Sequence, residues 1–264
     1  MKTTDQTLSD QQLFLLAHRR HHHFVHFARI LFLTVWELFA DFHIIDSFFF
    51  SSPSRVVACF VRMVSERSLF THIGITLTET VISFFLVALV SLSAATLLWY
   101  SRRLSEILEP FLVVLNSLPK SALAPLLIVW LGTGMDTIIA AGISVAIFGA
   151  IINLYTGFLQ ADPEKLLLIR TLGGTRRDCF FKVVLPASIP VILSNMKVNI
   201  GLSLVGVVIG EFLAARRGLG YLIIYGSQVL QLDMLITSIL LLCIIAMGLY
   251  QLLQFAEHCY KKKV

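Results

Sequence analysis

Six long apolar segments, separated by polar connections, constrain this chain of 264 residues more than any other feature. A helix needs about 20 mostly apolar residues to cross the hydrocarbon core of a bilayer. Each segment approaches or exceeds that length, although Arg29, Glu37, Asp41 and His43 interrupt the first one. The sequence therefore predicts an all-α membrane protein with about six transmembrane helices. The predicted spans are 27–45, 73–100, 107–131, 137–158, 189–212 and 232–255.

The composition supports a membrane protein and excludes several other classes. Hydrophobic residues make up 57% of the chain and charged residues only 14%, whereas about 25% of a soluble domain is charged. A chain of this size has too little interior to hide so much apolar surface from water. Four cysteines have neither close pairing nor metal-ligand spacing. Soluble globular, disordered and disulfide-stabilised folds are therefore excluded.

The positive residues indicate how the chain is oriented in the membrane. Cytoplasmic loops and tails carry an excess of Lys and Arg. With the N-terminus inside, most of the 21 Lys and Arg residues fall in inner connections and tails. We therefore expect both termini in the cytoplasm, with an inner tail over 1–26, one transmembrane domain over 27–256 and a basic tail over 257–264. The net charge of +5 is then an orientation signal, and no nucleic-acid partner is expected.

Two connections are longer than turns. The outer segment 54–67 has an apolar helical face, with Ser52 as N-cap and Pro53 at the first helical position. It predicts a short helix that either lies on the outer membrane surface or only packs against the spans. The inner segment 159–184 is mixed in charge and contains Gly173 and Gly174, which indicates a helix, a turn and a second helix.

The chain lacks the sequence motifs of common catalytic and phosphate-binding sites. It has no phosphate-binding Gly-x-x-x-x-Gly-Lys-Ser/Thr segment, no His-Glu-x-x-His and no Gly-x-Ser-x-Gly. His18, His21–His23 and His26 offer metal-binding nitrogens, but they lie beside Arg19 and Arg20 and suit the lipid headgroup level better. We therefore expect no enzymatic activity, no metal site and no cofactor held by this chain.

The segment 161–190 combines several helix signals in a short space. A helix that begins at Asp162, Pro163 and Glu164 has an acidic first turn, which suits its positive end. The glycine pair ends this helix, and Leu185-Pro186 with Pro190 marks the entry into the fifth span. The pattern is typical of a stiff lever on which a soluble partner pushes.

This segment resembles the cytoplasmic loop of the permeases of binding-protein-dependent ABC importers. The resemblance rests on Gly173, nine residues, Val183, one residue, and Leu185-Pro186. Where that family usually has Glu-Ala-Ala, this chain has Leu167-Leu168-Ile169. Further segments are similar to the nitrate, sulfonate and taurine subclass, in order along the chain: 50–54, 108–111, 122–126, 130–134, 211–213 and 218–221.

The resemblance implies a type I ABC importer permease in the inner membrane of a bacterium. Two copies would form the pathway, two ATP-binding subunits holding ATP and Mg would dock below, and an extracytoplasmic binding protein would deliver the solute. The solute would be a small anion such as an alkanesulfonate, taurine or nitrate, or alternatively a pyrimidine vitamin precursor. The residues expected to couple ATP hydrolysis to transport are Asp162, Glu164, Leu167, Leu168, Ile169, Gly173, Gly174, Arg176, Leu185 and Pro186.

Polar residues inside the spans are candidates for the lining of the pathway. Such residues face protein or water rather than lipid, so each one either lines the pathway or packs between helices. Lys197 either attracts an anion or pairs with Glu79 or Glu211. The candidate pathway residues are Asn116, Ser117, Lys120, Asn195, Asn199, Ser203 and Glu211.

Two other classes compete with this interpretation. A self-contained secondary carrier would need its own coupling-ion site and usually has inverted repeats with broken helices. No convincing repeat relates the two halves of this chain, although Pro119 and Pro125 offer places for a break. An intramembrane enzyme would need a nucleophile or metal motif, which the sequence lacks. The outer turn Arg216-Arg217-Gly218 is either a contact for the binding protein or an ordinary exposed turn.

Overall fold

The computed structural model describes residues 31, 34–39 and 51–262. Along these residues the ordered elements are helices, and no strand is found among them. The predicted inner tail over 1–26, with its histidines, and most of the predicted first span lie outside the described residues. The predicted all-α fold is therefore confirmed for the remaining part of the chain.

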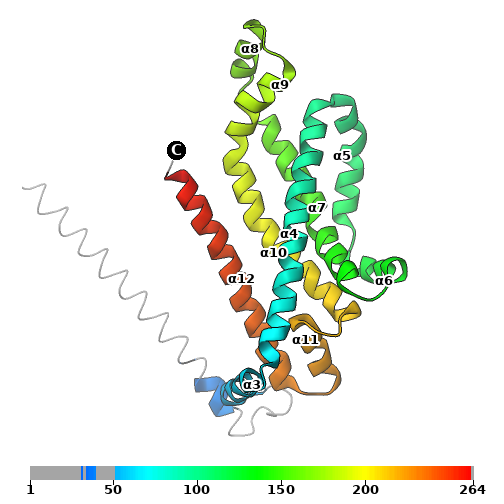
Figure 1. Ribbon diagram of the computed structural model, residues 1–264, viewed down its shortest axis with the longest axis vertical. Coiled ribbons are helices and arrows are strands. Elements are labelled where there is room, and N and C mark those ends of the chain that lie inside the picture. Colours follow the sequence, from blue (N-terminus) through cyan, green and yellow to red (C-terminus); the bar gives the residue numbers. More distant parts are fainter. Residues whose placement is uncertain (1–30, 32–33, 40–50, 263–264) are drawn as a thin grey trace, which may run out of the picture.

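Four helices are long and apolar enough to cross a membrane within the described part of the chain. They cover the predicted second, fourth, fifth and sixth spans. In Figure 1 they run roughly along the long axis of the molecule, between an end that carries α8 and an end that carries α3 and α11. These four helices are α4 (Ser68–Tyr100), α7 (Met135–Leu159), α10 (Leu185–Ala214) and α12 (Leu232–Lys261).

The predicted third span is bent rather than continuous. It consists of α5 (Arg102–Ser117) and α6 (Lys120–Leu131), whose axes meet at 97°. Pro119 explains the break, because proline lacks a backbone N–H and drives the residue before it into an extended conformation, as found at Leu118. The described residues thus hold up to five spans if the bent pair counts as one.

The predicted outer helix is confirmed as α3 (Pro53–Ser65). Ser52 caps it by accepting a hydrogen bond from the Arg55 backbone N–H at 3.4 Å. One face packs on the bundle through Cys59 and Met63, which join a core with Leu219 and Leu241. The opposite apolar face stays uncovered, and its members Val57, Phe60 and Val61 are exposed. An exposed apolar face of this kind fits a helix that lies on a membrane surface.

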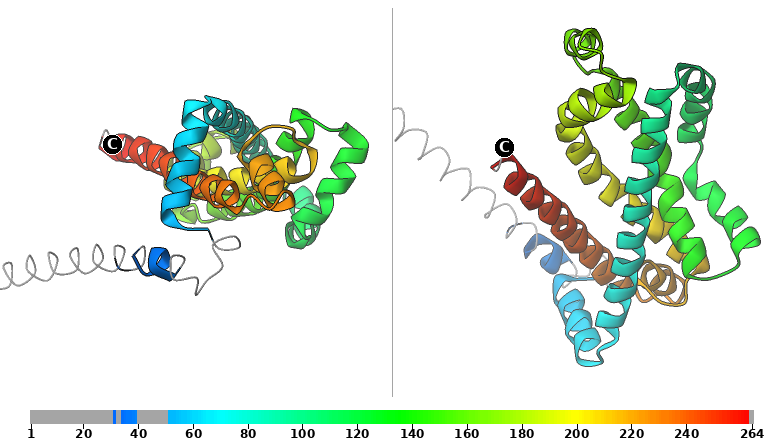
Figure 2. Two further views of the ribbon diagram at one scale, coloured as in Figure 1. Left: turned by 90° about the horizontal axis from the view of Figure 1, so that it is seen from below. Right: turned by 45° about the horizontal axis from the view of Figure 1, so that its top comes forward.

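Close packing of α10 against α7 and α4 forms the centre of the bundle, as the two views of Figure 2 illustrate. Small residues permit this approach. A β-carbon on Gly206 would lie only 2.7 Å from the Ala141 carbonyl oxygen, and one on Gly142 would lie 2.6 Å from Ser83 Oγ. Small residues at helix contacts are typical of helix packing in membranes. Because α10 contacts α4, α7, α11 and α12, a movement of its N-terminal end would affect most of the bundle.

Candidate functional site

The first candidate site is the helix–turn–helix between α7 and α10. Its first helix, α8 (Pro163–Thr171), stands at the end of the bundle opposite α3 (Figure 1). Asp162 caps it by accepting from the Glu164 backbone N–H at 2.9 Å. None of its residues is buried. The predicted helix with an acidic first turn is therefore present and projects away from the membrane helices.

Three leucines make the projecting surface of this segment unusually apolar. Leu167, Leu168 and Leu172 are 62%, 58% and 76% exposed. The other two apolar side chains of α8 are more covered: Leu166 packs on the core beneath the helix, and Ile169 lies against the glycine turn. We name Leu167, Leu168 and Leu172 the leucine face.

The glycine turn after α8 depends on backbone freedom. Gly173 has φ +81°, a left-handed conformation that residues with a β-carbon rarely adopt. The Gly174 N–H donates to the Ile169 carbonyl oxygen at 2.9 Å, and a β-carbon on Gly174 would overlap Ile169. Thr175 then caps α9 (Arg176–Cys179) in a reciprocal pair of hydrogen bonds with Asp178. Both predicted glycines are therefore needed to reverse the chain direction here.

An aromatic cluster anchors this turn to the membrane helices. Arg176 Nη2 donates to the Trp99 carbonyl oxygen at 2.9 Å, and its guanidinium lies 5.4 Å from the centre of the Trp99 ring. Phe180 packs against Trp99, Tyr100 and Phe158 with ring centres 5.2 to 5.5 Å apart. These aromatic residues were not among the predicted site residues, although their position at helix ends beside a charged loop was a usable signal.

The chain enters α10 through a π-helical segment, η1 (Phe180–Val184). Such segments are rare, occur mostly as single turns inside α-helices and are frequent at functional sites. The predicted Leu185-Pro186 follows directly and forms the start of α10. The stiff segment expected from the sequence is thus a continuous connection that runs from α8 past the aromatic cluster into α10.

The second candidate site is a polar groove of about 480 Å³ between α7 and α10. Its α7 wall carries Asn153, Thr156 and Gln160, which lie on one helical face at intervals of three and four residues. Ser194 and Asn195 supply the polar groups of the α10 wall. No charged side chain is among the described residues that line it. Four of these five polar residues were missed, because single amides and hydroxyls in an apolar run carry little signal.

The structure divides the predicted pathway residues of α10 into two groups. Asn195 lines the polar groove, and its Nδ2 donates to the Ala150 carbonyl oxygen at 3.4 Å. Asn199 and Ser203 are buried within the bundle, and Glu211 is buried at the opposite end from α8, where it accepts from Thr76. The stripe predicted at these spacings therefore exists. Asn195 and Asn199 also line a second groove of about 270 Å³, whereas Ser203 and Glu211 are fully buried.

The predicted cluster on the third span lies at the bend between α5 and α6. Asn116 and Ser117 are exposed. Lys120 Nζ donates to the carbonyl oxygens of Leu115 and Asn116 and lies 5.3 Å from the centre of the Phe148 ring. Lys120 therefore satisfies carbonyls at the broken end of α5.

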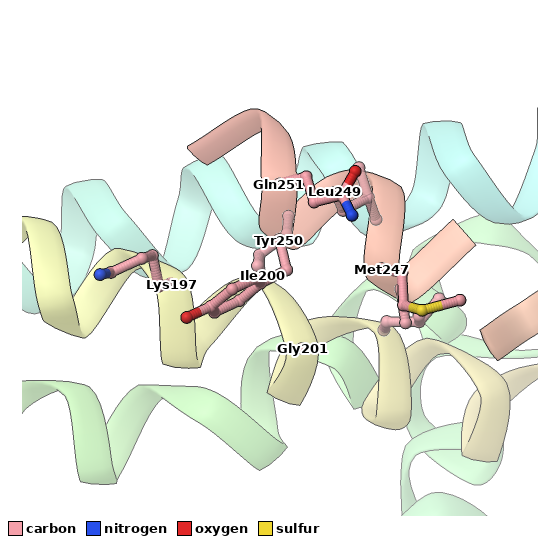
Figure 3. Close-up of a pocket in the computed structure, with 9 residues that line it drawn as sticks. Lys197, Ile200, Gly201, Met247, Leu249, Tyr250 and Gln251 are labelled. Atoms are coloured by element: carbon pink, nitrogen blue, oxygen red, sulfur yellow. The ribbon is translucent and has the colours of Figure 1, made fainter. Parts of the chain in front are cut away.

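Lys197 forms an ion pair, but with a different partner from those expected. Its Nζ lies 2.6 Å from Glu257 Oε2 on α12, and the two side chains are only 19% and 12% exposed. Glu79 and Glu211 are not its partners, because Lys197 points from α10 toward α12. A groove of about 360 Å³ runs between these two helices, with Lys197 near one end and Met247 near the other (Figure 3).

Comparison with protein families gives a match over most of the chain. The family described as "binding-protein-dependent transport system inner membrane component" matches residues 86–256. A probable ABC transporter permease protein of Haemophilus influenzae is 30% identical over 226 residues, which are 86% of this chain and 91% of that protein.

Two further relatives have more specific names. The taurine transport system permease protein of Escherichia coli is 26% identical, over 81% of this chain and 80% of that protein. The formylaminopyrimidine transport permease protein of Halalkalibacterium halodurans is 27% identical, over 73% of this chain and 76% of that protein.

Solved structures share the fold. A chain of an inward-facing methionine ABC transporter superposes with a TM-score of 0.63 at 20% identity, covering 75% of this chain and 97% of that chain. A chain of an amino acid ABC transporter gives 0.60 at 18% identity, with the same coverage. These matches show that the bundle of this chain has the fold of those two chains.

Proposed function

Because the chain belongs to the family of binding-protein-dependent transport system inner membrane components, we propose that two copies of it form the translocation pathway of an ATP-driven importer. The chain is a permease and does not itself hydrolyse ATP. ATP and Mg bind to a separate ATP-binding subunit, which docks at α8. A binding protein delivers the solute at the opposite end, so α8 and both chain termini face the cytoplasm.

The observation that carries this proposal is the leucine face of α8. Transfer of one leucine side chain out of water is favourable by about 2 kcal/mol, so three uncovered leucines on a projecting helix indicate a surface that a partner covers. Leu167 and Leu168 stand at the positions of the family's Glu-Ala-Ala. Glu164 precedes Leu167 by three residues and is therefore on the same side of the helix. Glu164 therefore offers a carboxylate one helical turn before Leu167, which stands where the family has its glutamate.

The polar groove supports a pathway between two copies. Amide and hydroxyl side chains in a membrane helix face protein or water, and the groove-facing residues Asn153, Thr156, Gln160 and Ser194 are exposed in the single chain. We propose that the groove-lining residues, with Asn116 and Ser117 on the α5 side, line the solute path. Asn199, Ser203 and Glu211 then hold the helices that form its wall.

For the solute we propose a small organic anion of the taurine or sulfonate type. Relatives named for transport of taurine and aliphatic sulfonates, each covering about four fifths of this chain, support it. A pyrimidine is the second candidate. It is favoured by the absence of charged side chains among the described residues that line the groove and by similarity to the formylaminopyrimidine permease.

Reconstitution tests this function directly. The chain is purified with a candidate ATP-binding subunit and a candidate binding protein from the same organism, and the complex is placed in proteoliposomes. We expect uptake of labelled taurine that requires both ATP and the binding protein. Labelled formylaminopyrimidine is the parallel probe for the second candidate. Uptake by the chain alone, driven by an ion gradient, would instead identify a secondary carrier.

A further inference from the structure

A buried carboxylate at the outer end of α10 binds groups from two other elements. Glu211 is fully buried. Its Oε1 accepts from Thr76 Oγ1 on α4 at 2.6 Å, and its Oε2 accepts from the Gly220 backbone N–H at the start of α11 (Leu219–Gln228). Each oxygen of the carboxylate therefore has a donor from a different element, so Glu211 joins α10 to both α4 and α11.

Two side chains of α4 complete the attachment of α11. The first N–H groups of a helix have no partners within the helix. Here the N–H groups of Gly218 and Leu219 donate to His72 Nδ1 at 3.0 Å and to Thr76 Oγ1 at 2.8 Å. We define the outer latch as His72, Thr76 and Glu211 together with the backbone N–H groups of residues 218–220. Side chains from two helices thus cap a third one.

The backbone of the outer loop is shaped to receive the carboxylate. Gly218 has φ +120°, and a β-carbon on either Gly218 or Gly220 would overlap the Glu211 carboxylate. The Glu211 side chain also faces the N-terminal end of α11, where backbone N–H groups have no partners within the helix. The geometry therefore fits a side chain with two acceptor oxygens at this position.

A second carboxyl group lies against the outer latch. Glu79, one turn beyond Thr76 on α4, is 3% exposed, and its Oε2 has no hydrogen-bond partner among the described residues. E79Q therefore makes the same change from carboxyl to amide close to the outer latch, at a residue that is not part of it, and provides a matched control.

The outer latch is connected to the coupling segment by a single helix. Residues 185–214 of α10 form 30 helical residues, or about 45 Å at 1.5 Å per residue, with η1 at one end and Glu211 at the other. Resting on the function proposed above, we propose that Glu211 is a positioning residue that fastens α11 and the outer loop to α4 and α10. We call the outer end of α10, the adjoining part of α4, the outer loop and α11 the outer corner. Displacement of α10 by the ATP-binding subunit then moves the outer corner as one rigid body.

The first experiment measures the rigidity of the outer corner and does not depend on transport. Spin labels replace Arg217, on the outer turn, and Thr78, on α4, both of which are exposed. The exposed Cys243 and Cys259 are changed to serine, whereas Cys59 and Cys179 are buried and remain. The full chain is studied in nanodiscs, diluted with unlabelled chain so that only distances within one copy are measured.

We expect one narrow distance distribution in the wild type and in E79Q, and a broad one in E211Q. In E211Q one carboxylate oxygen is replaced by an NH₂ group. That NH₂ faces either the Thr76 hydroxyl or the Gly220 backbone N–H, both of which are donors, so one hydrogen bond is lost. Thr76→Val removes one hydroxyl without changing shape and is expected to broaden the distribution as well, whereas Thr76→Ser keeps it narrow. A narrow distribution in both E211Q and Thr76→Val, or equal broadening in E79Q, would overturn the proposal.

The second experiment separates coupling from folding. Per assembled complex, E211Q is expected to lower taurine uptake about tenfold, in line with the loss of a charge-assisted hydrogen bond, while ATP hydrolysis without binding protein stays unchanged. A purely structural role would reduce the yield of complex and leave uptake per complex intact, which would overturn the proposal. If the wild-type complex moves no solute, the proposed function fails, and the distance measurements alone decide the role of Glu211.

Discussion

Arg176 lies over the ring of Trp99 and donates a hydrogen bond to its backbone carbonyl oxygen at 2.9 Å. This contact joins the short helix after the glycine turn to the C-terminal end of α4, 77 residues earlier in the chain. Phe180 extends the contact into η1 and α10. The segment from α8 to η1 is therefore attached to two membrane helices, so a displacement of α8 would act on both.

Replacement of Arg176 by alanine is expected to weaken coupling. The variant loses both the hydrogen bond to the Trp99 carbonyl and the cation–π contact, which together stabilise the joint by about 2 kcal/mol. Arg176→Lys keeps the charge but not the planar group, and an intermediate loss is expected. The measurement is solute taken up per ATP hydrolysed in proteoliposomes. Lys262, an exposed cation at the end of α12, provides the control substitution to alanine.

Replacement of Gly173 by valine is expected to uncouple transport while membrane insertion stays intact. The left-handed φ of +81° disfavours a β-branched residue, so the glycine turn shifts and α8 is displaced. ATP hydrolysis and uptake are compared in the same preparation. Gly248 lies within α12, where a β-carbon would meet nothing within 4 Å, and Gly248→Ala is the control. Normal uptake by the Gly173 variant would remove the turn from the coupling role.

Substitution of the leucine face by serine is expected to weaken docking of the ATP-binding subunit. Loss of two of the three leucines removes about 4 kcal/mol of apolar burial at the interface, which lowers affinity several hundredfold. Thermal stability of the permease itself is expected to change little, because these side chains are exposed. Co-purification of the two subunits measures the effect. The control is Val229→Ser, at an exposed position near the opposite end of the bundle; equal loss there would contradict the assignment.

Blocking the polar groove tests the solute path. Tryptophan at Thr156 fills much of the groove between α7 and α10 and is expected to stop uptake without changing assembly with the ATP-binding subunit. Val205 is 52% exposed on α10 and does not line the groove, so Val205→Trp is the matched control. Full uptake by the Thr156 variant would place the path elsewhere.

The ion pair between Lys197 and Glu257 gives a stability prediction. Because the two side chains are only 19% and 12% exposed, removing either one takes away a short charge-assisted contact between α10 and α12 and is expected to destabilise the packing of these two helices. Lys197→Met and Glu257→Leu are each expected to lower the unfolding temperature in detergent. The double variant is expected to recover most of the loss, since two apolar groups of similar size replace the pair. Additive losses in the double variant would contradict this account.

Much of the fold was accessible from local patterns. Apolar length predicted the spans that α4, α7, α10 and α12 cover, and Ser52-Pro53 predicted the start of α3. Pro119 was noted as an irregularity of the third span and as a place for a break, but the bend was not predicted, because proline also occurs inside continuous helices of this chain, as Pro190 does in α10. Hydropathy averaged over a window of residues does not distinguish one continuous spanning helix from two helices whose axes meet at 97°.

The candidate site was only partly accessible. Gly173, Gly174 and Leu185-Pro186 are close in sequence, and their pattern predicted the helix, turn and second helix that the structure contains. By contrast, the groove combines Asn153 of α7 with Ser194 of α10, and the outer latch combines Thr76 with Glu211. Neither pair leaves a local pattern, because its members come from different helices.

The sequence by itself determined the class of protein, the positions of most helices and the glycine turn after α8, because apolar length, proline and glycine act within a few neighbouring residues. The tertiary structure decided the partners: Glu257 for Lys197, Trp99 for Arg176 and Thr76 for Glu211. The physical reason is that helical periodicity tells which residues share a face, whereas the packing of the whole bundle decides what that face meets.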